Sequence, residues 1–146
     1  MAIFAQLDDN NIVINTFVVN DYDCGGGTLE NESVGVSYCK NLLGDDTNWK
    51  LSSKDATFRG NSVGMGITYM TGVRTLGVAS TDIFIEQQPF PSWSIGINTA
   101  TWYSPLGDDI TGPGITSTVE LDNDGKSYVW DESLYQSDNT KGWVLK

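Results

Sequence analysis

Residues 2–19, AIFAQLDDNNIVINTFVV, decide the fold. Two runs of β-forming residues, 2–7 and 12–19, flank the tetrad DDNN at positions 8–11. Asn and Asp tolerate positive φ and hydrogen-bond their own backbone, so this tetrad is typical of a tight turn. The stretch therefore predicts a β-hairpin, and the fold is expected to be built from antiparallel strands.

Residues 33–43, SVGVSYCKNLL, are the best candidate for a helix. Ser33 can cap its N-terminus, and Gly44 is a natural residue just past its end. The run 48–51 that follows is strand-like, so we expect the helix to cover a sheet that this strand re-enters. The predicted apolar stripe of the helix consists of Val34, Tyr38 and Leu42, widened by Cys39 and Leu43.

Residues 58–80 contain five glycines and show no clear period. This composition predicts a long extended loop with bulges. Loops of this length are uncommon inside a compact domain unless they contact something. We therefore interpret the segment as a partner-binding arm.

The second half of the chain predicts short hairpins. A strand begins at residue 82 and runs into the extended element Pro89–Pro91, which excludes a central strand there. Residues 92–104 predict a hairpin that carries Trp93 and Trp102 near its ends. Within the segment 115–146, Trp130 and Trp143 bracket a polar turn in the same way.

The stretch 105–114, PLGDDITGPG, is the strongest break in composition and predicts a linker. It separates a main β-rich domain, 1–104, from a C-terminal hairpin subdomain, 115–146, which can pack on the first. The predicted fold class is α+β and mainly antiparallel β. It has one short helix at about residues 33–43 and a C-terminal Trp-hairpin extension.

Charge and composition exclude several classes of function. The 146 residues include 19 acidic and 8 basic side chains, for a net charge of −11, and no histidine. Catalysis by Ser-His-Asp or Cys-His and zinc sites that use histidine are thereby excluded. The acidic excess argues against nucleic acid and anionic membranes as partners. No apolar run approaches a membrane helix, and the first residues do not read as a signal peptide, so we expect a protein used without secretion.

The two cysteines, Cys24 and Cys39, leave two readings open. In an unsecreted protein they are reduced thiols packed as small hydrophobic residues. Alternatively, a disulfide tethers the glycine-rich loop near residue 25 to the helix.

One acidic pattern resembles a calcium loop, but neither a metal site nor a cofactor is predicted. Its first residue is Glu where Asp is usual, its last is a short Asp, and its flanks are β-rich where an EF-hand needs helices. An Asp-Gly hairpin turn explains the same residues. The weak calcium candidates are Glu120, Asp122, Asp124 and Asp131.

No catalytic carboxylate pair stands out either. Fourteen of the acids are Asp in turn-like strings, where the side chain bonds its own backbone. A glycoside hydrolase, which needs two placed carboxylates, is therefore the least favoured function. The tryptophans can stabilise hairpins, form a protein interface or stack on sugar rings. The residues predicted to make intermolecular contacts are Phe58, Arg59, Met65, Tyr69, Met70, Phe90, Trp93, Trp102 and Trp130.

Four stretches together carry a family resemblance: residues 1–13, 34–50, 58–69 and 84–96. They resemble a recurrent small protein of marine tailed bacteriophages, especially cyanophages. In that family an F-A-x-L-D-x-N-N-x-V hairpin precedes a G-x-x-[FY]-C-x-x-L-[FL]-G helix. A T-x-W strand, an F-R-x-N-[YF]-A-G-[IM]-G-Y segment and a P-[FY]-P-S-W turn follow. Ser62-Val63 departs from the pattern, because the family has an aromatic residue followed by Ala.

The resemblance implies a virion or virion-associated protein that is made in the bacterial cytoplasm, with no catalytic residues to carry over. The tail, with YVWDES and GWVL, is similar to short Trp-hairpin units near the ends of phage structural proteins. We expect a non-enzymatic accessory protein on the capsid surface or the tail. Its partners would be major capsid or tail proteins and further copies of itself. The alternative is a host-attachment module that binds glycans through Trp93, Trp102 and Trp130.

Overall fold

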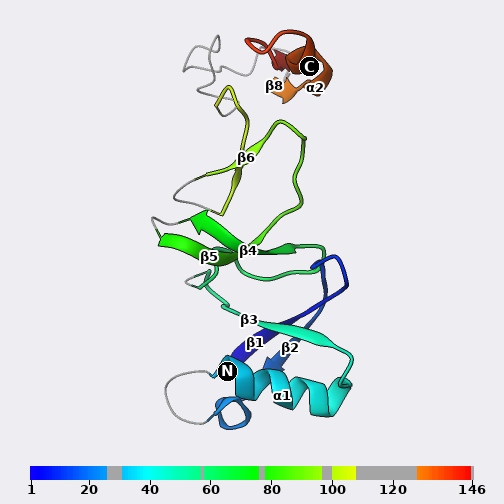
Figure 1. The fold of residues 1–146 in the computed structure, drawn as a ribbon, viewed down its shortest axis with the longest axis vertical. Helices are drawn as coiled ribbons and strands as arrows, with labels where there is room; N and C mark the ends of the chain where they lie inside the picture. Colours follow the sequence, from blue (N-terminus) through cyan, green and yellow to red (C-terminus); the bar gives the residue numbers. More distant parts are fainter. Residues whose placement is uncertain (26–30, 57, 76–77, 97–99, 108–127, 146) are drawn as a thin grey trace. The chain divides into compact units, whose positions relative to one another are not determined.

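The computed structural model describes residues 1–25, 31–56, 58–75, 78–96, 100–107 and 128–145. The chain divides into two compact units (Figure 1). Unit 1 comprises Met1–Gln87 and Gly96–Thr101, and unit 2 comprises Gln88–Ile95 and Trp102–Lys146. The described residues form nine strands in small antiparallel sheets and two α-helices, so the predicted α+β, mainly β class is confirmed.

The predicted N-terminal hairpin forms the centre of unit 1. Strands β1 (Ala2–Leu7) and β2 (Val13–Val19) pair antiparallel, and β3 (Asn48–Ser52) adds to the other side of β1. The carboxylate of Asp8 accepts hydrogen bonds from the Asn10 and Ile12 N–H groups, at 2.8 and 2.9 Å. Asn11 closes the turn at φ 61°, a conformation that Asn tolerates better than most residues.

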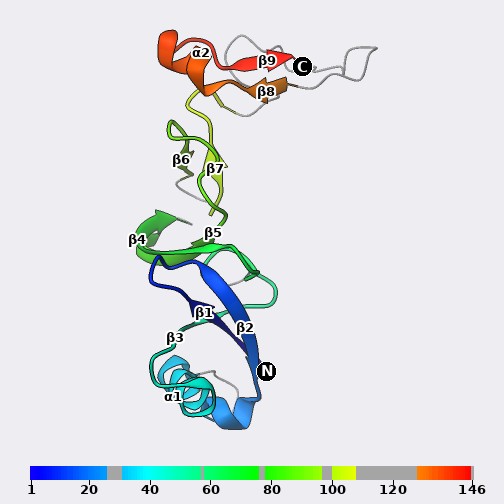
Figure 2. The same ribbon diagram turned by 90° about the vertical axis from the view of Figure 1, so that its right-hand side faces the viewer.

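Helix α1 (Glu32–Leu43) and the short 3-10 helix η1 (Asp21–Cys24) pack on one face of this sheet (Figure 2). The prediction of a helix is confirmed, but its cap was wrong. Asn31, and not Ser33, caps α1 by accepting a hydrogen bond from the Val34 N–H.

The predicted apolar stripe of α1 is confirmed at Cys39 and at the half-buried Tyr38, but it was wrong at its other three positions. Its buried face is centred on Gly35 and Cys39, whereas Val34, Leu42 and Leu43 are exposed. The cause lies at Gly35, where an added Cβ would meet the ring of Phe4 at 2.2 Å. The missing side chain allows the β1 aromatic ring to approach the helix backbone.

A second hairpin covers the opposite face of the sheet, to which the alternate β1 residues Ala5 and Leu7 point. Its strands are β4 (Thr68–Thr75) and β5 (Val78–Ile85). The predicted long loop over 58–80 is therefore wrong beyond residue 67. The pairing of β4 with β5 is shifted near Gly72, which has φ 66°, so the alternation that marks a strand is interrupted in the sequence.

Unit 2 contains two small hairpins. β6 (Ser94–Ile95) pairs with β7 (Trp102–Tyr103), as predicted. β8 (Tyr128–Trp130) pairs with β9 (Trp143–Leu145), which confirms the C-terminal Trp hairpin. Its connection contains a second helix, α2 (Glu132–Ser137), that the sequence reasoning missed. The predicted linker, 105–114, lies mostly outside the described residues.

Candidate functional site

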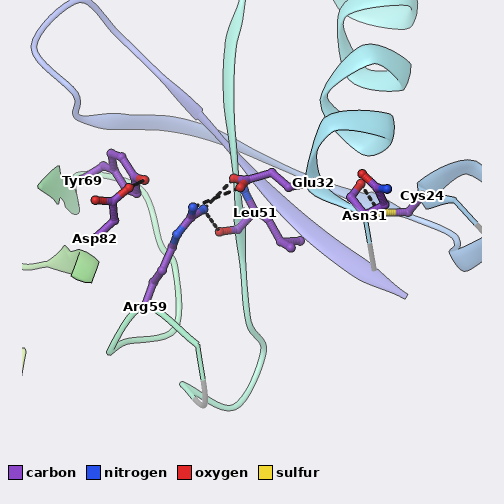
Figure 3. A network of polar contacts seen from close by, with 7 residues as sticks. All are labelled: Cys24, Asn31, Glu32, Leu51, Arg59, Tyr69 and Asp82. Carbon is purple, nitrogen blue, oxygen red and sulfur yellow. Dashed lines mark hydrogen bonds and ion pairs between the residues drawn. The ribbon is translucent and has the colours of Figure 1, made fainter. Parts of the chain in front are cut away.

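The most elaborate polar site of unit 1 is built around Arg59 (Figure 3). Its guanidinium forms two hydrogen bonds with the Glu32 carboxylate, Nη1 to Oε1 at 2.6 Å and Nη2 to Oε2 at 3.1 Å. Nη1 also donates to the carbonyl of Leu51 at 2.8 Å, and the Leu51 N–H donates to Glu32 Oε1 at 2.8 Å. The ion pair thus satisfies both backbone groups of one residue on β3.

The chain around Arg59 is shaped to hold this contact. Arg59 and Gly60 both have positive φ, 58° and 85°. A Cβ on Gly60 would lie 2.5 Å from that of Ala100, so no larger residue fits there. The Arg59 carbonyl accepts the Phe84 N–H at 2.9 Å, and Asn61 Nδ2 donates to the carbonyls of Phe84 and Ala100 at 2.7 and 2.8 Å.

An aromatic layer extends the Arg59 site. The guanidinium lies 5.3 Å from the ring centroid of Tyr69, and the ammonium of Lys50 lies 5.4 Å from the same centroid. The Tyr69 hydroxyl donates to Asp82, whose other oxygen accepts the Gly72 N–H at 3.0 Å. Both cations are therefore placed over an electron-rich ring face, an attractive arrangement.

The ionisable groups of the site are shifted in the directions that these contacts require. Burial alone would raise the pKa of Glu32, but the hydrogen bonds from Arg59 and Leu51 outweigh it and hold that pKa below its ordinary value. The hydrogen bond from Tyr69 lowers the pKa of Asp82. Burial, together with that same bond, raises the pKa of Tyr69. The arrangement stabilises charged carboxylates and a neutral phenol, which suits a structural clamp.

Several residues predicted to make intermolecular contacts are used inside the fold. Tyr69 and Trp130 are buried, and the side chain of Arg59 is only 12% exposed and paired. These three were wrongly predicted as surface contact residues, because internal partners cover them. Phe58 and Met65 are exposed, and Met70, Phe90, Trp93 and Trp102 are half-buried.

The tryptophans of unit 2 pack against one another. Trp130 and Trp143, opposite each other on β8 and β9, have ring centroids 5.3 Å apart at an edge-to-face angle of 77°. Trp93 lies about 6 Å from both rings, and Phe90 lies 5.6 Å from Trp93. Because Trp130 is buried within this cluster, it offers no ring face to a sugar.

Glu132, at the start of α2, supports the same aromatic cluster. One of its oxygens accepts from the Trp130 indole N–H at 2.8 Å and from the Ser92 hydroxyl at 2.7 Å. The other accepts from Gln136 at 2.9 Å. The bond from Trp130 is the main cause that lowers the pKa of Glu132.

The remaining predicted sites have simple positions. Cys24 and Cys39 are free thiols buried in the same apolar cluster under α1. Of the weak calcium candidates, Asp131 caps α2 by accepting the Leu134 N–H at 2.9 Å, and the other three lie outside the described residues. The described residues contain no group of three metal-ligating side chains. No helix among them is long and apolar enough to cross a bilayer.

Sequence reasoning missed Glu32 and Asp82, the two carboxylates of the Arg59 site. Glu32 is 27 residues from Arg59 in the sequence, and Asp82 is 13 residues from Tyr69. A weak signal existed for Glu32, since acidic residues favour the first turn of a helix.

No protein-family model matches this chain, and no curated protein or solved structure is detectably similar to it.

Proposed function

We propose that this chain is a non-enzymatic structural protein of a phage virion, an accessory protein on the capsid surface or attached to the tail. The proposal begins from the resemblance of residues 1–96 to small proteins of marine tailed phages. The observation that carries it is the location of the residues that define the resemblance. They serve the packing and hydrogen bonding of the fold, so what such proteins would share is an architecture.

Each motif supports this argument. Phe4 of the first motif contacts Gly35 of the helix motif. Arg59 and Asn61 of the F-R-x-N motif bind Glu32 and the backbone of two other segments. In the P-F-P-S-W motif, Phe90 packs against Trp93. A protein selected for a shaped and stable body, and not for chemistry, would place its characteristic residues in this way.

Charge and surface fit the same role. A net charge of −11 limits non-specific association of a protein present in many copies. Docking would then depend on local uncharged features, and Phe58 and Met65 on the segment before β4 remain exposed for it. The turn from Pro89 to Trp93 is the second docking element that we propose.

The test is to purify particles of the phage whose genome encodes this chain. We expect the chain in the particles at a fixed stoichiometry to the major capsid or tail protein, measured by quantitative mass spectrometry and located by cryo-EM. An abundant cytoplasmic enzyme of the host serves as the control for contamination. Finding the chain in infected cells but never above this control in particles would overturn the proposal. So would turnover of a polysaccharide that is abolished by removing one carboxylate.

A further inference from the structure

Strand β2 is an edge of the three-stranded sheet of unit 1, whose order is β2-β1-β3 (Figure 2). The N–H of Thr16 donates to the Asn15 side chain at 2.9 Å, so it is turned away from β1. Because the backbone N–H and C=O groups of successive residues point to opposite sides of a strand, those of Val18 also point away from β1. At its start, β2 is already covered, since Val13 exchanges two hydrogen bonds with Gly66 and Ile67. Among the described residues, only the Asn15 side chain occupies an outward backbone group of residues 14–19, so this is the part of the edge open to a further strand.

The chemistry of this edge favours pairing with another strand. The sequence of β2 is VINTFVV, with no charge and no proline, in a chain of net charge −11. Ile14 and Val18 are large, apolar and exposed, at 45% and 54%. Natural edge strands are usually protected by charged side chains, proline or a covering element. The exposed part of β2 contains neither a charged side chain nor a proline.

The opposite edge of the sheet is closed to such pairing. On β3, the Leu51 N–H binds Glu32 and the Leu51 carbonyl binds Arg59. An added strand would have to displace Glu32 and Arg59 from these groups. One open and one blocked edge do not support a continuous array of sheets, because a head-to-tail contact needs both. They favour a self-complementary contact that closes after two copies.

We infer that a second copy of this chain binds the open edge, with the two β2 strands pairing antiparallel about a two-fold axis. The strand that best matches β2 is β2 itself, because it carries no charge in an acidic chain, so no like charges meet within the paired strands. Acidic residues lie just beyond each end, Asp8 and Asp9 at one and Asp21 and Asp23 at the other. In this antiparallel pair, the acidic end of one copy faces the opposite acidic end of its partner. Added salt therefore strengthens the association.

The interface is small, since one pair of strands buries well under the roughly 1,600 Å² of a standard interface. We therefore expect a weak, concentration-dependent dimer in solution. Sedimentation velocity from micromolar to millimolar concentration measures it, in low salt and again in high salt. Val18→Lys places a charge on the paired edge and is expected to weaken the association roughly tenfold or more. Leu42→Lys adds the same charge at an exposed site on α1, outside the paired strand, and should leave the association unchanged.

Hydrogen exchange of the unmodified chain gives a second readout that does not depend on a variant. The amides of Thr16 and Val18 should become more protected as protein concentration rises, while the amide of Leu42 in α1 should not. A monomer at all concentrations, a dimer equally weakened by both substitutions, or exchange at Thr16 that ignores concentration would each overturn the inference. It does not rest on the virion role, so either proposal can fail alone.

Discussion

Arg59 adopts a left-handed backbone conformation that a bulky residue seldom takes, with φ 58°. Such a conformation costs on the order of 1 kcal/mol. It persists because the surrounding contacts determine it: the carbonyl binds β5, and the guanidinium binds Glu32 and Leu51. The planar fork of arginine matches the carboxylate with two parallel bonds, which a lysine could not reproduce. Arg59, which lies in the loop between β3 and β4, thereby links helix α1 to strands β3 and β5.

Glu32→Gln tests the clamp directly. The substitution keeps the shape of the side chain but leaves the guanidinium of Arg59 without its ionic partner while it is only 12% exposed. Removing one partner of a fully buried pair costs about 3–5 kcal/mol, and the partial exposure of Glu32 reduces this to about 2 kcal/mol. Urea unfolding measures the loss. Asp9→Asn, which removes a charge in the exposed turn, is the control and should change stability by less than about 0.5 kcal/mol. Equal effects of the two substitutions would contradict the clamp.

Cys39 predicts a loss of stability in alkali. Burial, with a contribution from neighbouring Cys24, raises the pKa of Cys39 from 9.0 to about 11. The unfolded chain releases this proton near pH 9, whereas the folded chain retains it until about pH 11. The contribution of Cys39 to the free energy of unfolding is therefore fully present below pH 9 and is lost as the pH rises to about 11. Tyr69, whose pKa is also raised, adds a similar loss only above its ordinary value of 10.

Unfolding free energies measured from about pH 8 to about pH 10 isolate the thiol. The unmodified chain should lose stability over this interval. Cys39→Ala should be less stable at the lower pH, because a buried group is removed, but its profile should be flatter. Parallel profiles for the two proteins would show that Cys39 does not carry the alkaline dependence.

At the scale of elements, two residues at the start of α1, Asn31 and Ser33, can be compared as its N-cap. Asn31 accepts the Val34 N–H and the Ser33 hydroxyl, at 3.3 and 2.9 Å, so Asn31→Ala removes the cap. The expected loss is about 1 kcal/mol. Ser33→Ala removes a side chain that lies within the first turn and should cost less than about 0.5 kcal/mol. Chemical denaturation compares them, and a larger effect of Ser33→Ala would contradict the assigned cap.

The packing of α1 on β1 depends on Gly35. In Gly35→Ala the new methyl would overlap the ring of Phe4, and such overpacking costs about 1–3 kcal/mol. The gain in helix propensity, about 1 kcal/mol, offsets only part of it. Gly64→Ala is the matched control, because its Cβ would meet only Ile67 at an ordinary 3.9 Å.

A second substitution shows whether the Phe4 ring is the cause. Phe4→Leu shortens the side chain opposite Gly35, so adding Gly35→Ala to it should cost less than adding it to the unmodified chain. The coupling between the two changes is read from a double-mutant cycle of urea unfolding curves. Simple additivity would mean that the methyl group acts elsewhere.

At the scale of the whole molecule, sequence reasoning was most successful where contacts are local. The hairpin around Asp8 could be predicted because the turn residues and both strands lie within one short segment. The β4–β5 hairpin was missed because the pairing is shifted at Gly72, which breaks the alternation. The partner of Arg59 lies 27 residues away on a helix, and no local spacing identifies it. The predicted apolar stripe of α1 was wrong at Val34, Leu42 and Leu43, because the buried face includes a glycine, Gly35, which a hydrophobic pattern does not register.

The net charge of −11 gives a last prediction, for the effect of salt. Like charges repel more strongly in the compact state, and salt screens exposed charges beyond about 10 Å at 0.1 M. The Arg59–Glu32 pair opposes this trend little, since it is largely shielded from solvent. Thermal stability should therefore increase by roughly 1 kcal/mol, or a few degrees, between low salt and about 0.5 M sodium chloride.

Association through β2 would respond to salt in the same direction, so the thermal scans must use a concentration at which sedimentation shows only the monomer. Glu32→Gln serves as the internal comparison. If general repulsion dominates, this variant has a lower midpoint but the same dependence on salt as the unmodified chain. A midpoint that falls with salt in the unmodified chain, and does not in Glu32→Gln, would instead show that the ion pair is exposed and that specific attraction outweighs the excess of negative charge.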